Sequence, residues 1–196
     1  MEIIFLVILF IVICYVSYLF VSIFAQEEKR NHEVLKRQAE KRRGKTQKSL
    51  LMPPILEFSD KGRNISVFSA YKESEGSSSL MKCSLKQCRA YNCTILEQSS
   101  LPFPSMSKYP QKIHLKEPIS SRFIIYSNDK DMTEQFVNTK VREVFENLYA
   151  LKKFEIKNGF FVLKIAEAIT DDQTADRFIE AGLTMIQRLI DLHTTK

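Results

Sequence analysis

The sequence predicts an α+β domain that follows an N-terminal membrane-spanning helix. Three observations support this fold class: a long apolar run at the start, short strand-like segments in the middle, and two amphipathic helices around a hairpin signal near the end. Strands followed by a helix, a hairpin and a helix are typical of an antiparallel sheet with helices packed on it. We therefore predict a transmembrane anchor (1–25), a charged helical stalk beside the membrane (26–50) and an α+β domain (51–196).

The apolar run extends from Ile3 to Phe24 and contains no charged residue. As a helix, its 22 residues would rise about 33 Å, which matches the roughly 30 Å hydrocarbon thickness of a bilayer. A buried core helix is disfavoured because the rest of the chain is too short to enclose a helix that is apolar on all sides. A cleaved signal peptide, which would leave a periplasmic domain starting near Gln26, normally begins with positive charge, whereas Glu2 precedes this run.

Nine basic residues lie directly after the apolar run, between Lys29 and Lys48, and no Lys or Arg precedes the run. They are Lys29, Arg30, Lys36, Arg37, Lys41, Arg42, Arg43, Lys45 and Lys48. Basic residues that flank a span stay in the cytoplasm, so we predict a single-pass protein of the inner (plasma) membrane with its N-terminus outside and its domain cytoplasmic.

The positive charge of the chain is concentrated in this stalk. Residues 26–50 contain nine basic and four acidic residues, a net charge of +5, whereas the chain after residue 50 has 20 basic and 18 acidic residues, a net charge of +2. A nucleic-acid-binding protein would carry its basic patch on the folded domain. We therefore expect the nine basic side chains to contact the bilayer and its anionic headgroups, and nucleic acid is not an expected partner.

The middle of the chain has the pattern of short strands. They are predicted at residues 63–71, 80–85, 91–97, 112–116 and 122–127. The segment from Gly44 to Pro54 is expected to be irregular, because Gly44 breaks the stalk helix and Pro53-Pro54 cannot donate backbone hydrogen bonds.

The last third of the chain carries the strongest local signals. Asp131 and Glu134 have the spacing of a capping box at the start of a helix. The apolar stripe of that helix consists of Phe136, Val137, Val141, Val144, Phe145 and Leu148. Asn158-Gly159 between two apolar segments predicts a hairpin, because a type I′ turn needs positive φ at both central residues. A final amphipathic helix is predicted from about Asp172 to Leu192.

Three segments of the domain resemble a family of bacterial membrane-anchored proteins of unknown function. They are Gly62-Arg63-Asn64-Ile65, Leu101-Pro102-Phe103, and Phe123 to Asp129 with Phe123, Tyr126 and Asp129 at the family's spacing. The likeness covers about residues 62–190 and departs from the family pattern at Ile65, where the family has glycine. It implies a bacterial inner-membrane setting, and the family has no established catalytic residues that could be carried over.

Three cysteines of the domain, Cys83, Cys88 and Cys93, are separated by four residues each, with His114 downstream. Zinc sites usually begin with a closer pair and end with another, so we expect buried, reduced thiols and neither a metal nor a cofactor. A cysteine nucleophile would require one of these thiols beside His114 or His193. The acidic residues at the helix starts are expected to cap backbone amides. They are Asp129, Asp131, Glu134, Asp171, Asp172 and Asp176.

Without a visible catalytic set, the sequence favours a non-catalytic interaction domain that binds an unidentified protein partner. Two alternatives remain open: a membrane-tethered enzyme whose site is assembled from scattered residues, and a periplasmic domain. A concave pocket with two or more convergent ionisable groups would favour the enzyme. The sequence does not indicate an oligomeric state.

Overall fold

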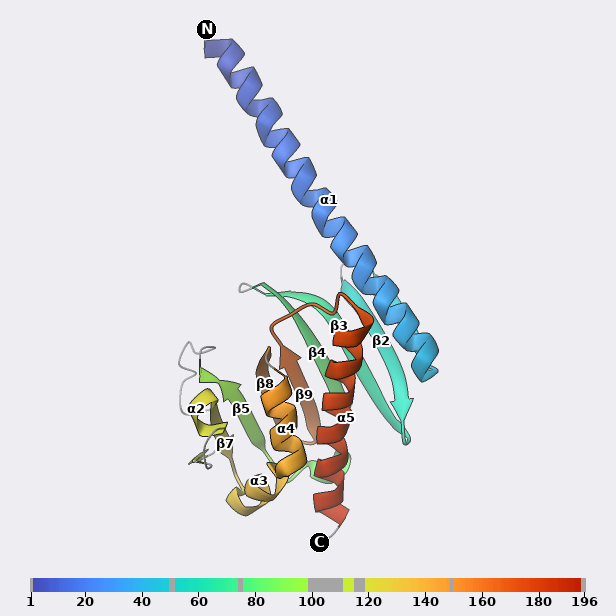
Figure 1. Cartoon of the computed structure of the whole chain (residues 1–196), viewed down its shortest axis with the longest axis vertical. Coiled ribbons are helices and arrows are strands. Elements are labelled where there is room, and N and C mark those ends of the chain that lie inside the picture. The colour runs from blue at the N-terminus through green and yellow to red at the C-terminus, as the bar shows by residue number, and fades with distance from the viewer. Residues whose placement is uncertain are drawn as a thin grey trace.

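The protein folds as the predicted α+β class, with a long N-terminal helix, a nine-stranded antiparallel sheet and a C-terminal helix. The computed structural model describes residues 2–49, 52–73, 76–98, 111–114, 119–148 and 150–194. Figure 1 shows that the first part of α1 (Glu2–Arg42) protrudes from the domain, while its last part lies beside β2. The Leu101-Pro102-Phe103 segment of the family resemblance lies outside the described residues.

The sheet has the strand order β1-β2-β3-β4-β9-β8-β5-β7-β6. Its strands are β1 (Lys45–Ser49), β2 (Met52–Asp60), β3 (Arg63–Glu73), β4 (Gly76–Ser84), β5 (Cys93–Glu97), β6 (Lys112–Ile113), β7 (Phe123–Ser127), β8 (Leu151–Lys157) and β9 (Phe160–Ile165). The helices after α1 are η1 (Lys86–Cys88, a 3₁₀ turn), α2 (Ile119–Arg122), α3 (Lys130–Phe136), α4 (Thr139–Asn147) and α5 (Asp172–Thr194).

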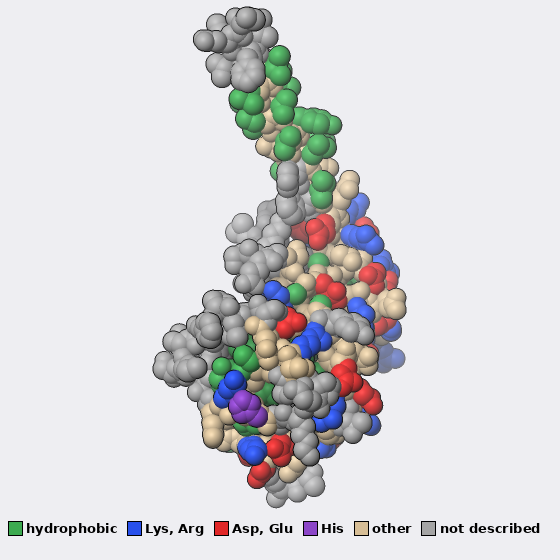
Figure 2. Space-filling model, turned by 60° about the vertical axis from the view of Figure 1, so that its left-hand side comes forward, with side chains coloured by type: hydrophobic (Ala, Val, Ile, Leu, Met, Phe, Trp, Pro, Cys, Tyr) green, Lys and Arg blue, Asp and Glu red, His purple; other side chains and the backbone are tan. Residues whose placement is uncertain are grey.

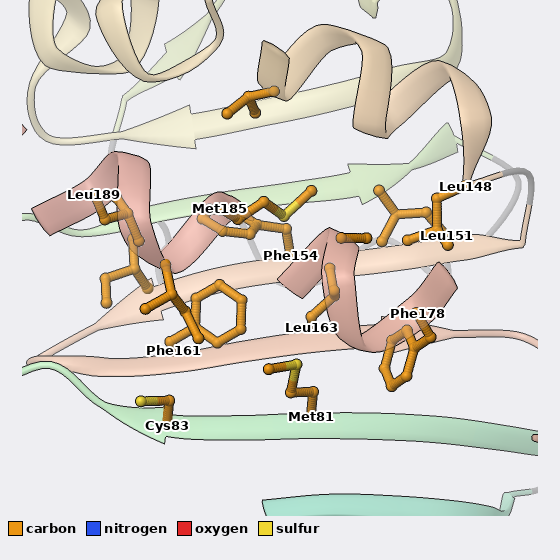
Figure 3. Packing of buried hydrophobic residues seen from close by; sticks show 14 of the residues in the cluster. Met81, Cys83, Leu148, Leu151, Phe154, Phe161, Leu163, Phe178, Met185 and Leu189 are labelled. Carbon is orange, nitrogen blue, oxygen red and sulfur yellow. The ribbon is translucent and has the colours of Figure 1, made fainter. Parts of the chain in front are cut away.

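The hairpin and the last helix form as predicted. Asn158 and Gly159 have φ values of 53° and 78°, so both central residues of the β8–β9 turn adopt positive φ. The buried face of α5 includes Phe178, Met185 and Leu189. Figure 3 shows these side chains packed on residues of β4, β8 and β9.

Aromatic rings form the centre of the core between the sheet and the helices. Phe154 of β8 stacks on Phe136 of α3 with ring centroids 5.0 Å apart. It also meets Phe161 of β9 at 5.7 Å and Phe145 of α4 at 6.4 Å, both edge to face. Such pairs stabilise a core by about 0.5–1.5 kcal/mol beyond the area they bury.

Two expectations about local structure are wrong. The segment from Gly44 to Pro54 is not irregular: it contains β1 and the start of β2, which pair from Lys45↔Glu57 to Ser49↔Met52 across a bulge. Pro53 and Pro54 are tolerated because they lie at the start of β2, next to this break in register.

The predicted helix after residue 131 is also two helices rather than one. α3 is capped by Asp129, whose carboxylate accepts from the Met132 amide at 2.8 Å, so Asp131 is not the cap. Asn138 then starts α4 by accepting from the Val141 amide at 3.1 Å. An asparagine is a strong N-cap, and its side chain competes with continuation of the preceding helix.

Candidate membrane-coupling site

The first part of α1 is apolar and is not enclosed by the domain. Within the described residues, α1 is one helix that is long and apolar enough to cross a membrane, a test that a signal sequence also passes. The large apolar side chains that are described between Ile8 and Ile23 are exposed; Phe10, for example, is 68% exposed. Figure 2 shows apolar side chains covering the protruding part and charged ones beginning where the helix reaches the domain. The alternative of a buried core helix is therefore excluded.

The second part of α1 belongs to the domain core. Asn31, Val34, Leu35, Gln38 and Ala39 are each at most 5% exposed. Their spacing of three and four places all five on one face of the helix, which packs on β1, β2, β3 and α5. The expectation of a solvated helical stalk is therefore wrong for this segment, because its few apolar residues fall on a single stripe that the sheet covers.

Charged side chains join this part of α1 to α5. Arg37 Nε lies 2.8 Å from Asp172 Oδ2, and Lys41 Nζ lies 2.8 Å from Asp176 Oδ1. Arg42 Nη2 bridges Asp176 and Glu180 at 3.3 and 2.8 Å. Exposed pairs contribute little singly, but this network fixes the rotation of α1 relative to α5.

The environment of Asp176 shows how the network is held. Burial opposes ionisation of Asp176, but the hydrogen bond and the charge of Lys41, helped by Gln38 and Arg42, outweigh it and lower the pKa of its carboxyl. A folded-state pKa below the ordinary value gives stability at pH values above that ordinary pKa, and this stability is lost as the pH falls through the lowered pKa. The predicted capping role holds for Asp171, which accepts from the Thr174 amide at 2.7 Å.

One buried polar residue in this interface has no partner among the residues that the structure describes. Both side-chain polar atoms of Asn31 are buried and form no hydrogen bond with them. An unsatisfied buried amide costs about 1–3 kcal/mol.

The structure divides the nine predicted headgroup-contacting residues. Arg37, Lys41 and Arg42 are bound to α5. Lys45 lies 3.5 Å from Glu57, and Lys48 lies 3.3 Å from Glu28. The remaining four have no ion pair within the described residues and are Lys29, Arg30, Lys36 and Arg43.

The cysteines of the domain are buried, as predicted, and form no disulfide among the described residues. Cys88 Sγ lies 3.5 Å from His193 Nδ1, so the structure brings together one of the two cysteine–histidine pairings considered above. The same nitrogen lies 2.7 Å from the Leu189 carbonyl and must donate to it, so it is not free to accept the thiol proton. Burial raises the pKa of Cys88 to about 11. This thiol is therefore neither exposed nor activated.

Cys93 lies in a hydroxyl network that the sequence did not reveal. Thr133 Oγ1 lies 3.0 Å from Tyr91 Oη. The same hydroxyl lies 2.8 Å from Ser127 Oγ, to which it can donate a hydrogen bond. Burial is the main reason that the pKa of Cys93 rises to about 11. This network connects β5 and β7 to α3. In the part of the chain that the structure describes, no group of three His, Cys, Asp or Glu side chains could hold a metal ion.

A pocket of about 400 Å³ opens where α1 ends, against β2 and β3. Its ionisable lining groups are Arg43, Lys45 and Glu57. Glu57 is occupied by Lys45 and by Gln47, whose amide donates to it at 2.9 Å. Three ionisable groups therefore converge on this pocket, which is the feature named above as favouring a membrane-tethered enzyme, so that alternative stays open. Neither histidine nor cysteine is among its lining residues.

No protein-family model matches the sequence, and no curated protein is significantly similar to it. Among solved structures, the chain is similar to the crystal structure of the mycobacterial trehalose monomycolate transport factor A, TtfA. The TM-score is 0.58 at 10% sequence identity, and the match covers 83% of this chain and 93% of that chain. This likeness shows the fold alone. The resemblance to a family of unknown function is not confirmed.

Proposed function

We propose that the chain is a single-pass membrane protein that holds a non-catalytic interaction domain at the cytoplasmic face of the inner membrane. The observation that carries this proposal is the continuity of α1, whose exposed apolar half leads without a break into a half that is packed in the domain core. Such a helix fixes the orientation of the domain relative to the bilayer. The similarly folded TtfA is named a transport factor, which is in keeping with a binding role.

The basic residues nearest the apolar run are the proposed headgroup contacts. Lys29 and Arg30 follow Phe24 by five and six residues, which is about 8–9 Å along a helix and within about one Debye length. Lys48 is held at the same level by Glu28. Arg37, Lys41 and Arg42 are farther along α1 and are already paired, so we no longer assign them to the bilayer.

Labelling of an introduced cysteine tests the orientation. The native domain cysteines are buried, so a membrane-impermeant maleimide should not react with them in the folded protein. With Lys86→Cys, whose site is exposed on η1, we expect labelling only after the plasma membrane is permeabilised. A Glu2→Cys variant should show the opposite pattern and be labelled in intact cells.

Labelling of Lys86→Cys before permeabilisation would instead place the domain outside. Loss of the Glu2→Cys label from the mature chain would indicate a cleaved signal peptide and a periplasmic domain. The wild-type chain is the control and should stay unlabelled, because its three domain thiols are buried and Cys14 lies inside the apolar run that is proposed to span the bilayer.

The binding surface is proposed on the sheet face opposite α5. Side chains alternate along a strand, so Phe160 and Lys82 face away from their buried neighbours Phe161 and Cys83. Among the described residues outside α1, Phe160 is the one large apolar side chain that is exposed, at 63%. Exposed aromatic residues are frequent anchors of protein interfaces.

Crosslinking in cells tests this surface. A photoreactive amino acid in place of Phe160 should give an adduct of defined mass, whereas the same group in place of Lys130, which is exposed on α3, should not. The absence of a defined adduct at position 160, or identical adducts at both positions, would contradict the proposed interaction surface.

A further inference from the structure

The pocket at the end of α1 is formed where the chain turns from the helix into the sheet. Its volume of about 400 Å³ lies within the range of small-molecule sites. The residues that line it come from three consecutive elements, and they are Arg43, Gly44, Lys45, Glu57, Phe58, Ser59, Asn64, Ile65 and Ser66. Figure 1 shows this end of α1 beside β2, far from the N-terminus.

Arg43 has an unusual backbone conformation. Its φ is 53°, in the left-handed region that favours glycine after a helix. The next residue, Gly44, donates from its amide to the Ala39 carbonyl at 2.8 Å and lies so close to β2 that an added Cβ would collide with the Glu57 carbonyl. The backbone is thus fixed, and an arginine occupies a strained position where glycine would fit.

The guanidinium of Arg43 differs from its neighbours in having no ion pair. Lys41 and Arg42 are bound to α5, whereas Arg43 is exposed and pairs with no acid among the described residues. Lys45 and Glu57 offset one another, so Arg43 leaves the pocket with a net charge of +1. Ser59, Asn64 and Ser66 add neutral donors around this charge.

We propose that this pocket binds a small soluble molecule through a phosphate group, with Arg43 as the principal contact. A planar guanidinium with hydroxyl and amide donors nearby matches the oxygens of a phosphate. Arg42 follows Phe24 by 18 residues, which places this end of α1 about 27 Å from the apolar segment. That separation favours a soluble phosphate over a lipid headgroup.

Equilibrium dialysis of radiolabelled inorganic phosphate against the full chain in phosphatidylcholine nanodiscs tests the proposal. Arg43→Gly removes the guanidinium and places glycine where positive φ is needed, so the fold should be retained. We expect this variant to bind phosphate at least about tenfold more weakly than the wild type. Lys61→Gly is the matched control, because Lys61 is also a basic residue at positive φ (48°) but bonds to Gln187 and does not line the pocket. Its affinity should match the wild type.

Three outcomes would overturn the proposal. They are the absence of phosphate binding by the wild type, equal binding by Arg43→Gly and the wild type, and equal weakening by Arg43→Gly and Lys61→Gly, which would indicate general electrostatic attraction. Nanodiscs that contain phosphatidylglycerol distinguish the source of the phosphate. We expect the same affinity in them; competition by the anionic lipid would assign the pocket to a headgroup and reject the soluble ligand.

Discussion

Replacing Phe154 by alanine is expected to cost about 3–5 kcal/mol of folding free energy. The Phe154 ring is fully buried and contacts the rings of Phe136, Phe145 and Phe161, which come from α3, α4 and β9. Its loss would leave a cavity between β8 and these three elements, because the surrounding structure relaxes only partly into the space of a lost ring. For a chain of this length, the thermal midpoint should fall by about 10 °C, measured by circular dichroism on the full chain in detergent.

Phe160→Ala provides the matched control for this prediction. It removes the same ring from the same hairpin, but Phe160 is 63% exposed and has little packing to lose. Its effect should stay within about 0.5 kcal/mol. Equal destabilisation by the two substitutions would mean that the aromatic cluster is not the centre of the core.

Features determined by local chemistry were predictable from the sequence. The β8–β9 hairpin follows from Asn158-Gly159, since few other residue pairs adopt positive φ twice in succession. The stripe of α5 follows from its apolar spacing, and burial of the three domain cysteines follows from the behaviour of free thiols. In each case a few neighbouring residues carry the information.

Features that depend on distant partners were not predictable. β1 has the sequence Lys-Thr-Gln-Lys-Ser, which lacks the apolar alternation of a strand and is ordered by its pairing with β2. Its lysines suit an edge strand, where charge discourages pairing with other chains. The apolar spacing continues across the break between α3 and α4 and therefore predicted a single helix, whereas the structure shows Asn138 capping a second one.

The candidate site also combines a feature that local sequence predicts with one that depends on distant partners. The apolar run of α1 was readable from composition, whereas its docked half was not, because two of its five buried residues are the polar Asn31 and Gln38. Residue type alone predicts exposure for such side chains. The charges of Arg37 and Lys41 predicted contact with the membrane surface. Only the fold shows that these side chains pair with acidic residues of α5, which are more than 130 positions away in sequence.

Replacing Leu35 by alanine should show whether the second part of α1 is packed on the domain or is a solvated stalk. Leu35 is fully buried where α1 packs on the domain, so the substitution is expected to cost about 3 kcal/mol of folding free energy. The loss should appear as a lower midpoint of urea unfolding with an unchanged slope, because the docked half of α1 and the sheet form one cooperative core. Protease cleavage within residues 31–42 should accelerate in parallel.

Lys36→Ala is the control, since Lys36 is the adjacent residue but lies on the exposed face of α1. Its effect should remain within about 0.5 kcal/mol, and cleavage of the helix should be as slow as in the wild type. If Leu35→Ala were equally mild, the segment would behave as a solvated stalk, and the domain would be tethered to the anchor rather than oriented by it. A large difference between these neighbours means that the domain cannot change its orientation to the anchor without losing part of its core.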